Sequence, residues 1–270
     1  MREHDYNPEI ERIEQLFSKH KDHEPFLNQI DFSLLESLFQ DHAQQSGRDI
    51  RRDFLGKQGI RSMILGQTAF FDLDASIIGI DYSVINRQML ETMNDEPYRT
   101  LEYLLLLCHE EVHAVSSKTG SKRQYSIGYL RVVPQGEYST ERRYDLFNEI
   151  VSSKLANAVF DEYVRRSGLA DTEQLQIFRG YENDNPAVKK FRRFGEDLLD
   201  RICEVASKGT GTRPQEIWQT LIRGLFRGAD IANDAELQQI LKKALKPHGI
   251  KKLAIARTLE DLKQLVKTDD

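Results

Sequence analysis

Apolar residues recur every three to four positions along most of the chain, with polar residues between them. This spacing places the apolar side chains on one face of a helix, as Phe32, Leu35 and Phe39 illustrate. The pattern predicts helices over residues 8–20, 32–44, 98–117, 144–167, 187–206, 213–227, 234–246 and 258–267. The chain is therefore predicted to be mainly helical.

Two runs rich in β-branched or aromatic residues interrupt the helical pattern. Thr68–Phe71 and Ile77–Tyr82 predict a pair of strands joined by a turn. We expect Ile77–Tyr82 to lie at the edge of a sheet, where an exposed strand can pair with an extended peptide, and Gly79 to mark the close approach of another backbone. Tyr129–Val133 predicts one more short strand, whereas residues 49–66 give no clear pattern.

These elements predict an α+β fold. A small antiparallel sheet is expected to pack on the two apolar helices 98–117 and 144–167, and a helical C-terminal lobe is expected to close a cleft beside them. The chain is accordingly divided into N-terminal helices in residues 1–48, a core in 49–168 and a helical C-terminal lobe in 169–270.

Composition narrows the class of protein. The 270 residues are 39% hydrophobic and 30% charged, as in soluble globular proteins, and the formal net charge of −5 gives no basic excess for nucleic acid. The longest fully apolar run, Tyr103–Cys108, is far too short to span a bilayer, and no apolar signal segment follows Met1. With two cysteines and no disulfide framework, we expect a cytoplasmic protein that binds neither nucleic acid nor membrane.

The run His109-Glu110-Glu111-Val112-His113 lies in the predicted helix 98–117. His109 and His113 are four positions apart, so both imidazoles lie on one helix face and can bind one ion. Zinc suits such ligands, and Glu110, about 100° round the helix, can act on a water there as general base. The alternative is two ordinary core histidines. It is disfavoured because two histidines and two acids in an apolar helix need a partner.

Glu149 is the predicted third metal ligand. It follows Phe147 and precedes Ile150 and Val151 at the start of the second apolar helix, so its carboxylate is expected to point inward. A buried carboxylate needs a positive partner, which a zinc ion would provide. The alternative is a surface or salt-bridged glutamate.

The run HEEVH, followed downstream by NEIVSS, resembles the HExxH…NExxS pattern of gluzincin metallopeptidases, as in thermolysin-like enzymes. The resemblance implies a zincin-like fold, His109, His113 and Glu149 as zinc ligands, and Glu110 as the general base in hydrolysis of a peptide bond. The substrate would be a peptide or protein. The likeness covers the active-site core, and the whole chain is similar to uncharacterised cytoplasmic bacterial predicted zincins with a helical tail.

Two features depart from the thermolysin pattern. Ser153 stands where that pattern has an aspartate that supports a ligand histidine, so we expect this support from Asp145, Asp74 or a backbone carbonyl. The family's downstream histidine, which stabilises the transition state, has no evident equivalent. His248 is the only histidine after the motif, and its neighbour Pro247 indicates a turn.

A phenol could replace that histidine. Tyr129, Tyr138 and Tyr144, together with Tyr125, lie between the two motifs, although packing is the alternative role for each. Glu111 is expected to be a salt-bridging or rim residue.

Two other functions remain open: a zinc-binding regulatory or interaction module that hydrolyses nothing, and a metal-free helical scaffold. Bound zinc would exclude the scaffold. Turnover that depends on Glu110 would exclude the silent module.

Overall fold

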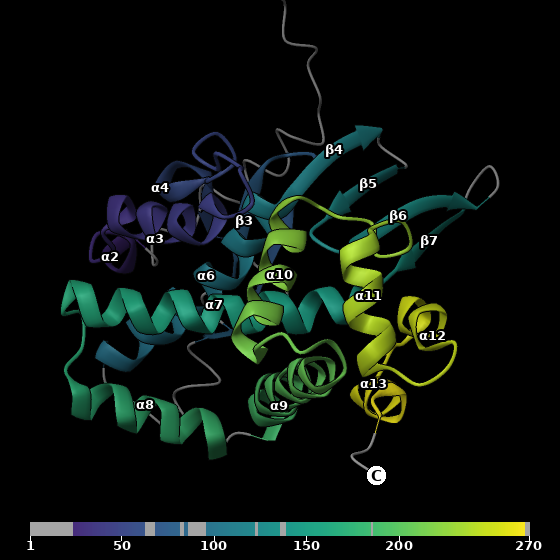
Figure 1. Ribbon diagram of the computed structural model, residues 1–270. Coiled ribbons are helices and arrows are strands. Elements are labelled where there is room, and N and C mark those ends of the chain that lie inside the picture. The colour runs from purple at the N-terminus through teal and green to yellow at the C-terminus, as the bar shows by residue number, and fades with distance from the viewer. Residues whose placement is uncertain are drawn as a thin grey trace, which may run out of the picture.

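The fold is α+β, as expected. The computed structural model describes residues 24–62, 68–81, 84–85, 96–121, 124–135, 139–184 and 186–267 (Figure 1). Its helices are α2 (Glu24–Leu27), α3 (Phe32–Gln44), α4 (Gly56–Gly59), α6 (Glu96–Ser116), α7 (Asp145–Ser167), α8 (Thr172–Asp184), α9 (Pro186–Thr210), α10 (Pro214–Phe226), α11 (Ala235–Ala244), α12 (Gly249–Ile255) and α13 (Leu259–Leu265). Its strands are β1 (Ile60–Ser62), β2 (Ala69–Asp72), β3 (Ile77–Ile80), β4 (Ser117–Ser121), β5 (Gln124–Ile127), β6 (Leu130–Gln135) and β7 (Ser139–Arg143).

The strands form two sheets instead of the single antiparallel sheet expected. The first has the order β1-β3-β2, with β1 parallel and β2 antiparallel to β3. The second is an antiparallel meander in the order β4-β5-β6-β7, and it connects α6 to α7. The prediction that Ile77–Tyr82 is an edge strand is wrong for its described part, because Ile77–Ile80 lies between β1 and β2. Tyr82 lies outside the described residues.

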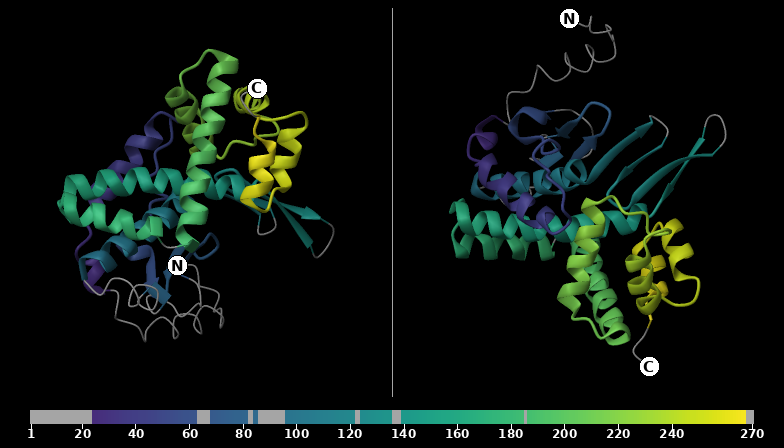
Figure 2. Two further views of the ribbon diagram at one scale, coloured as in Figure 1. Left: turned by 90° about the horizontal axis from the view of Figure 1, so that it is seen from below. Right: turned by 45° about the horizontal axis from the view of Figure 1, so that its top comes forward.

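Helices α6 and α7 form the centre of the molecule. They pack directly against each other, and α3, α9 and α10 also pack on α7; seen from below, α9 crosses α7 (Figure 2). Local sequence fixes the ends of α7. Tyr144 precedes it with a left-handed φ of 59°, and Gly168 ends it at φ 69°, a conformation that favours glycine.

The hydrophobic core is continuous from the N-terminal helices to the C-terminal ones. Buried side chains such as Phe39 of α3, Phe147 of α7 and Leu241 of α11 belong to one cluster. This one cluster contains residues of all three predicted segments, so it gives no boundary between them, and the division stays a prediction.

Most predicted helices are confirmed to within a few residues. The helix expected over 8–20 lies outside the described residues. Four described helices, α2, α4, α8 and α12, were not predicted. Between the two apolar helices a single strand, Tyr129–Val133, was expected, where the structure has the four-stranded meander.

Candidate metal centre

Helix α6 presents two histidines to one point. His109 and His113 are separated by one turn, and their Nε2 atoms lie 3.1 Å apart. The His109 side chain is 21% exposed and that of His113 10%, so both rings are mostly buried but keep some contact with solvent.

Helix α7 brings Glu149 to the same point. Its two carboxylate oxygens lie 3.3 Å from Nε2 of His109 and 3.4 Å from Nε2 of His113. The three residues form a group that can hold a metal ion, with one ligand atom from each lying within 4.8 Å of the others.

The two imidazole nitrogens have a spacing close to that of ligands of a small, four-coordinate ion. Ligand atoms arranged tetrahedrally at the usual zinc distance of about 2.0–2.1 Å lie about 3.3–3.4 Å from one another, and the two Nε2 atoms are 3.1 Å apart. Glu149 reaches them with different oxygens, Oε2 toward His109 and Oε1 toward His113. The carboxylate thus pairs with both imidazoles, as a buried charged group requires.

The electrostatics at this point reflect that mutual attraction. Burial lowers the pKa of His113, but the Glu149 carboxylate outweighs it and raises the pKa to about 9. Burial raises the pKa of Glu149, yet the two histidines together bring it well below its usual range. The carboxylate is therefore ionised and available as a negative ligand.

Ser153 supports the first histidine. Its Oγ lies 3.4 Å from Nδ1 of His109, one turn beyond Glu149 on α7. The expectation that Asp145 or Asp74 gives this support is corrected, because Asp145 pairs with Arg142 at 2.7 Å and Asp74 is exposed in the turn between β2 and β3. The serine at the position of the gluzincin pattern's aspartate thus contacts the ring itself, through a hydroxyl oxygen.

Glu110 lies beside the triad without belonging to it. Its side chain is buried and lines the same cavity as the two histidines. The pKa of Glu110 is raised overall, because burial outweighs the lowering by the nearby histidines and by a hydrogen bond from the backbone of Phe71. This is the position expected of a carboxylate that acts on a water and not on the metal.

Glu111 has a structural role that differs from the expected rim position. Its carboxylate is fully buried and accepts backbone N–H bonds from Leu55 at 3.2 Å and Gly56 at 2.9 Å. Burial raises its pKa to about 8, although those two bonds oppose the shift. Glu111 therefore fixes the segment before α4 against α6.

A cavity of about 450 Å³ opens at the metal centre. Strand β2 and the meander form its walls, with Asn148 beside Glu149. The lining residues are Ala69, Phe70, Phe71, His109, Glu110, His113, Tyr125, Ile127, Leu130, Arg142, Asn148 and Glu149. No described residue of the segment 169–270 is among them, so the expectation that the C-terminal lobe closes this cleft is corrected.

The tyrosines predicted to stabilise the transition state have other positions. The hydroxyl of Tyr129 is buried and donates to the carbonyl of Leu221 at 2.6 Å, so it is not available to a substrate. Tyr144 lines a different cavity, and Tyr138 lies outside the described residues. Tyr125 does line the metal cavity.

Two residues of the cavity wall were missed by sequence reasoning. Arg142, the next-to-last residue of β7, is held by Asp145, and the Asn148 side-chain oxygen accepts the backbone N–H of Tyr129 at 2.8 Å. Asn148 is the first residue of the NExxS motif, and that was the only signal for it. Arg142 has no motif of its own.

In the parts of the chain that the structure describes, no helix has both the length and the apolar character needed to cross a bilayer. Comparison with known proteins adds no relative: no protein-family model matches this chain, nor does any curated protein or solved structure.

Proposed function

We propose that this protein is a zinc-dependent, gluzincin-like peptidase with a zincin-like catalytic core. The observation that supports this most directly is the convergence of His109, His113 and Glu149, whose ligand atoms lie within 4.8 Å of one another, with the Glu110 carboxylate in the same cavity. Two imidazoles and one carboxylate are a ligand set of catalytic zinc sites, which leave a position open for water or substrate.

Zinc would supply Lewis acidity, which polarises a carbonyl oxygen and makes a water more acidic. The protein's own contribution begins with Glu110. It takes a proton from the attacking water and later passes it to the leaving amine. Its burial beside the histidines, outside the ligand group, supports this role.

Strand β2 is the proposed docking edge for the substrate. Among described residues it pairs only with β3, and the backbone of Phe71 hydrogen-bonds to the Glu110 carboxylate. The edge of β2 that carries this group therefore faces the metal centre. An extended peptide added to that edge would lie along the ligands, held by main-chain hydrogen bonds.

The cavity wall offers two donors for the oxygen of a tetrahedral intermediate. Tyr125 comes from β5 and Arg142 from β7. The Arg142 guanidinium is oriented by Asp145 through one of its nitrogens, which leaves other N–H groups for a substrate oxygen.

The test compares the parent with Glu110→Gln and with Glu141→Gln. Glu141 is a carboxylate of β7 that pairs with Arg143 outside the cavity, so its replacement makes the same chemical change elsewhere. Zinc content after dialysis and cleavage of a mixed peptide library are measured for each protein. The parent and Glu141→Gln should hold one zinc and cleave peptides, whereas Glu110→Gln should keep the zinc and lose about 10² to 10⁴ in rate.

If the parent holds zinc but cleaves no peptide, and Glu110→Gln changes nothing, the protein is a silent metal-binding module. If dialysed parent protein retains no zinc and His113→Ala behaves identically, the metal centre itself is refuted.

A further inference from the structure

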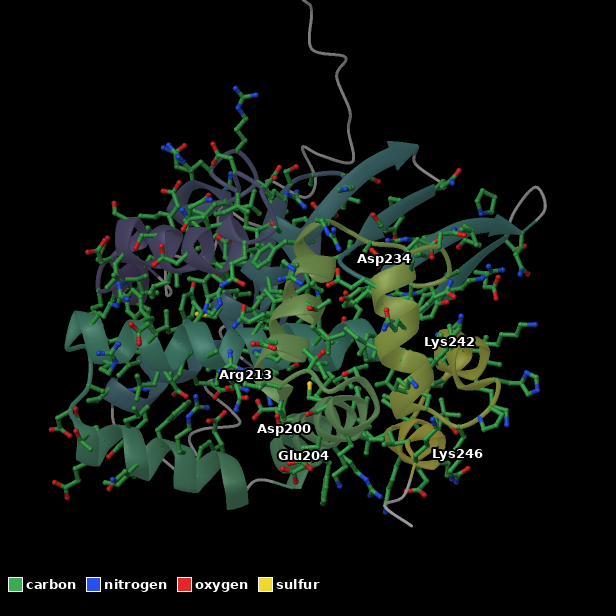
Figure 3. All side chains as sticks on the ribbon, in the orientation of Figure 1. Asp200, Glu204, Arg213, Asp234, Lys242 and Lys246 are labelled. Atoms are coloured by element: carbon green, nitrogen blue, oxygen red, sulfur yellow. The ribbon has the colours of Figure 1, made fainter. Side chains whose placement is uncertain are left out.

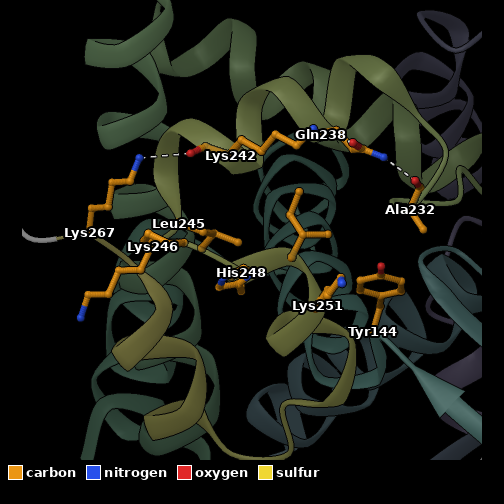
Figure 4. A pocket seen from close by; sticks show the side chains of 12 residues that line it. Tyr144, Ala232, Gln238, Lys242, Leu245, Lys246, His248, Lys251 and Lys267 are labelled. Atoms are coloured by element: carbon orange, nitrogen blue, oxygen red, sulfur yellow. Dashed lines mark hydrogen bonds between the residues drawn. The ribbon is translucent and has the colours of Figure 1, made fainter.

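A second cavity lies away from the metal centre, between α11, α12 and the residue that precedes α7 (Figure 4). Its volume is about 520 Å³, within the range of small-molecule sites. It shares no lining residue with the metal cavity. Any ligand bound here would therefore be distinct from the substrate of the proposed peptidase.

The inner wall of this cavity is apolar. The ring of Tyr144 and the side chains of Leu245, Pro247 and Ile250 line it. Tyr144 and Leu245 are both almost completely buried. An apolar body of about the size of an aromatic ring system would be removed from water here.

Backbone bonds hold these walls in place. The N–H of Tyr144 donates to the carbonyl of Ala254 at 2.9 Å, and that of Lys246 to the carbonyl of Leu265 at 2.8 Å. Leu245 and Val266 form an isolated antiparallel bridge. The cavity is therefore pre-formed, which lowers the ordering cost of binding.

Apart from the phenol of Tyr144, the ionisable side chains that line the cavity are all basic. They are Lys242, Lys246, His248, Lys251 and Lys267, and no aspartate or glutamate is among the described lining residues. Lys242 and Lys246 stand at the α11–α12 end of the molecule (Figure 3). This is notable in a chain with 43 acidic and 38 basic residues.

None of these four lysines has a carboxylate partner within the part of the chain that the structure describes. Lys242 donates to the side-chain oxygen of Gln238, and Lys267 to the backbone carbonyls of Lys242 and Lys243. Many arginines, such as Arg179 and Arg213, are paired with acids. The positive charge round this cavity is thus uncompensated.

We propose that this cavity binds a small aromatic acid. The apolar wall would take the ring system, and the anionic group would face the lysines at the rim. Charge complementarity selects an anion, because a cation of the same shape would meet only like charges. The proposal does not depend on the peptidase function.

The test uses the full-length, zinc-loaded protein and three probes that share one ring system. Naphthalene-2-sulfonate is anionic and a poor zinc ligand, 2-naphthol is neutral, and naphthalen-2-ylmethanamine is cationic. Their affinities are measured by fluorescence titration and calorimetry. The sulfonate should bind at one site per chain, at least fivefold more tightly than the neutral probe, and the amine should not bind measurably.

Two double variants locate the site. Lys246→Gln with Lys251→Gln removes two charges from the rim, whereas Lys243→Gln with Lys252→Gln removes two exposed charges from the same region outside the cavity. The rim variant should bind the sulfonate about five- to tenfold more weakly, as expected for two partly solvated ion pairs. The control variant should bind like the parent.

Several results would overturn the proposal: no saturable binding of the sulfonate, equal affinity for all three probes, or equal losses in the two double variants. A marked gain in sulfonate affinity on replacing Asp269 and Asp270 by asparagine would also overturn it. That gain would show that the carboxylates of Asp269 and Asp270 compete with the sulfonate for the cavity.

Discussion

Replacing Ser153 by alanine removes a side-chain oxygen that lies 3.4 Å from Nδ1 of His109. When Nε2 of a histidine binds a metal, a partner at Nδ1 fixes the ring and its tautomer. Ser153→Ala should therefore weaken zinc binding without removing a ligand. Ser152, the residue before it on α7, provides the matched control, because its hydroxyl is buried and has no hydrogen-bond partner among the described residues.

The expected size of the effect follows from the geometry. Loss of an outer-shell partner typically costs 10- to 100-fold in metal affinity. The 3.4 Å contact is longer than the usual hydrogen bond of about 2.9–3.0 Å, and a hydroxyl is a neutral acceptor. We therefore expect the lower end of that range, about tenfold or 1.4 kcal/mol. Ser153→Asp, which makes the acceptor negative, should strengthen zinc binding relative to the parent.

Zinc affinity is measured by competition with a chromophoric chelator for the parent, Ser153→Ala, Ser152→Ala and Ser153→Asp. Thermal unfolding of the metal-free proteins checks that all four fold alike. The metal-induced gain in stability should also fall by about 1.4 kcal/mol in Ser153→Ala at saturating zinc. The reasoning is refuted if Ser153→Ala binds zinc as tightly as the parent, or if Ser152→Ala loses as much affinity.

Three further predictions concern acids and a phenol near the site. Glu149→Gln should lose zinc affinity first and regain part of its activity in excess zinc, whereas Glu110→Gln should bind zinc like the parent and stay inactive. Chelator competition and peptide turnover distinguish the two variants. If Glu149→Gln binds zinc as tightly as the parent, the third ligand lies elsewhere. Tyr129→Phe should lower the free energy of unfolding by about 1 kcal/mol through the lost bond to Leu221, with unchanged turnover per zinc-loaded molecule; a large loss of turnover would return Tyr129 to the list of catalytic groups. The raised pKa of Glu111, about 8, means that its contribution to stability is full below its unfolded pKa and is lost as the pH rises through 8. Urea unfolding from about pH 5 to pH 8 should therefore show Glu111→Gln gaining about 4 kcal/mol relative to the parent, and parallel curves would contradict this.

The helices were predictable because their apolar faces are local signals. The segment 32–44 matches α3 residue for residue, and 144–167 begins one residue before α7. Helix α8 was missed because its apolar residues are sparse and Gly180 interrupts it, and α12 because it has only seven residues.

The sheets were harder to predict because strand order depends on distant pairing. Ile77–Ile80 is central only because Ile60–Ser62 adds alongside it in parallel, and nothing local to either segment encodes that contact. The meander contains polar strands such as Ser117–Ser121 and Ser139–Arg143, which lack the apolar alternation used to recognise strands.

The His-His-Glu group that can hold a metal ion was predictable, whereas its surroundings were not. His109 and His113 follow from helix geometry, and Glu149 from a carboxylate in an apolar context. The Glu111 carboxylate accepts hydrogen bonds from the backbone of Leu55 and Gly56, and a pattern of side chains does not predict such a contact. Support for His109 was expected from Asp145, Asp74 or a backbone carbonyl, because Ser153 lacks the carboxylate that the gluzincin pattern has there. The Ser153 hydroxyl nevertheless lies 3.4 Å from the ring.

The described C-terminal helices do not line the cavity beside His109 and His113. Helix α10 nevertheless contacts the turn between β5 and β6, two strands that form part of the cavity wall. Gly128 sits there at φ 54°, and a methyl group added to it would come within 2.4 Å of Leu225 in α10 and 2.5 Å of the Asn148 side-chain oxygen. The next residue, Tyr129, is bonded to α10 and to Asn148. The turn at Gly128 and Tyr129 therefore connects α10 to Asn148, the residue that precedes Glu149. A chimaera that grafts a foreign helical tail onto residues 24–167 would have to reproduce that fit, so the two parts are expected to fold as one unit.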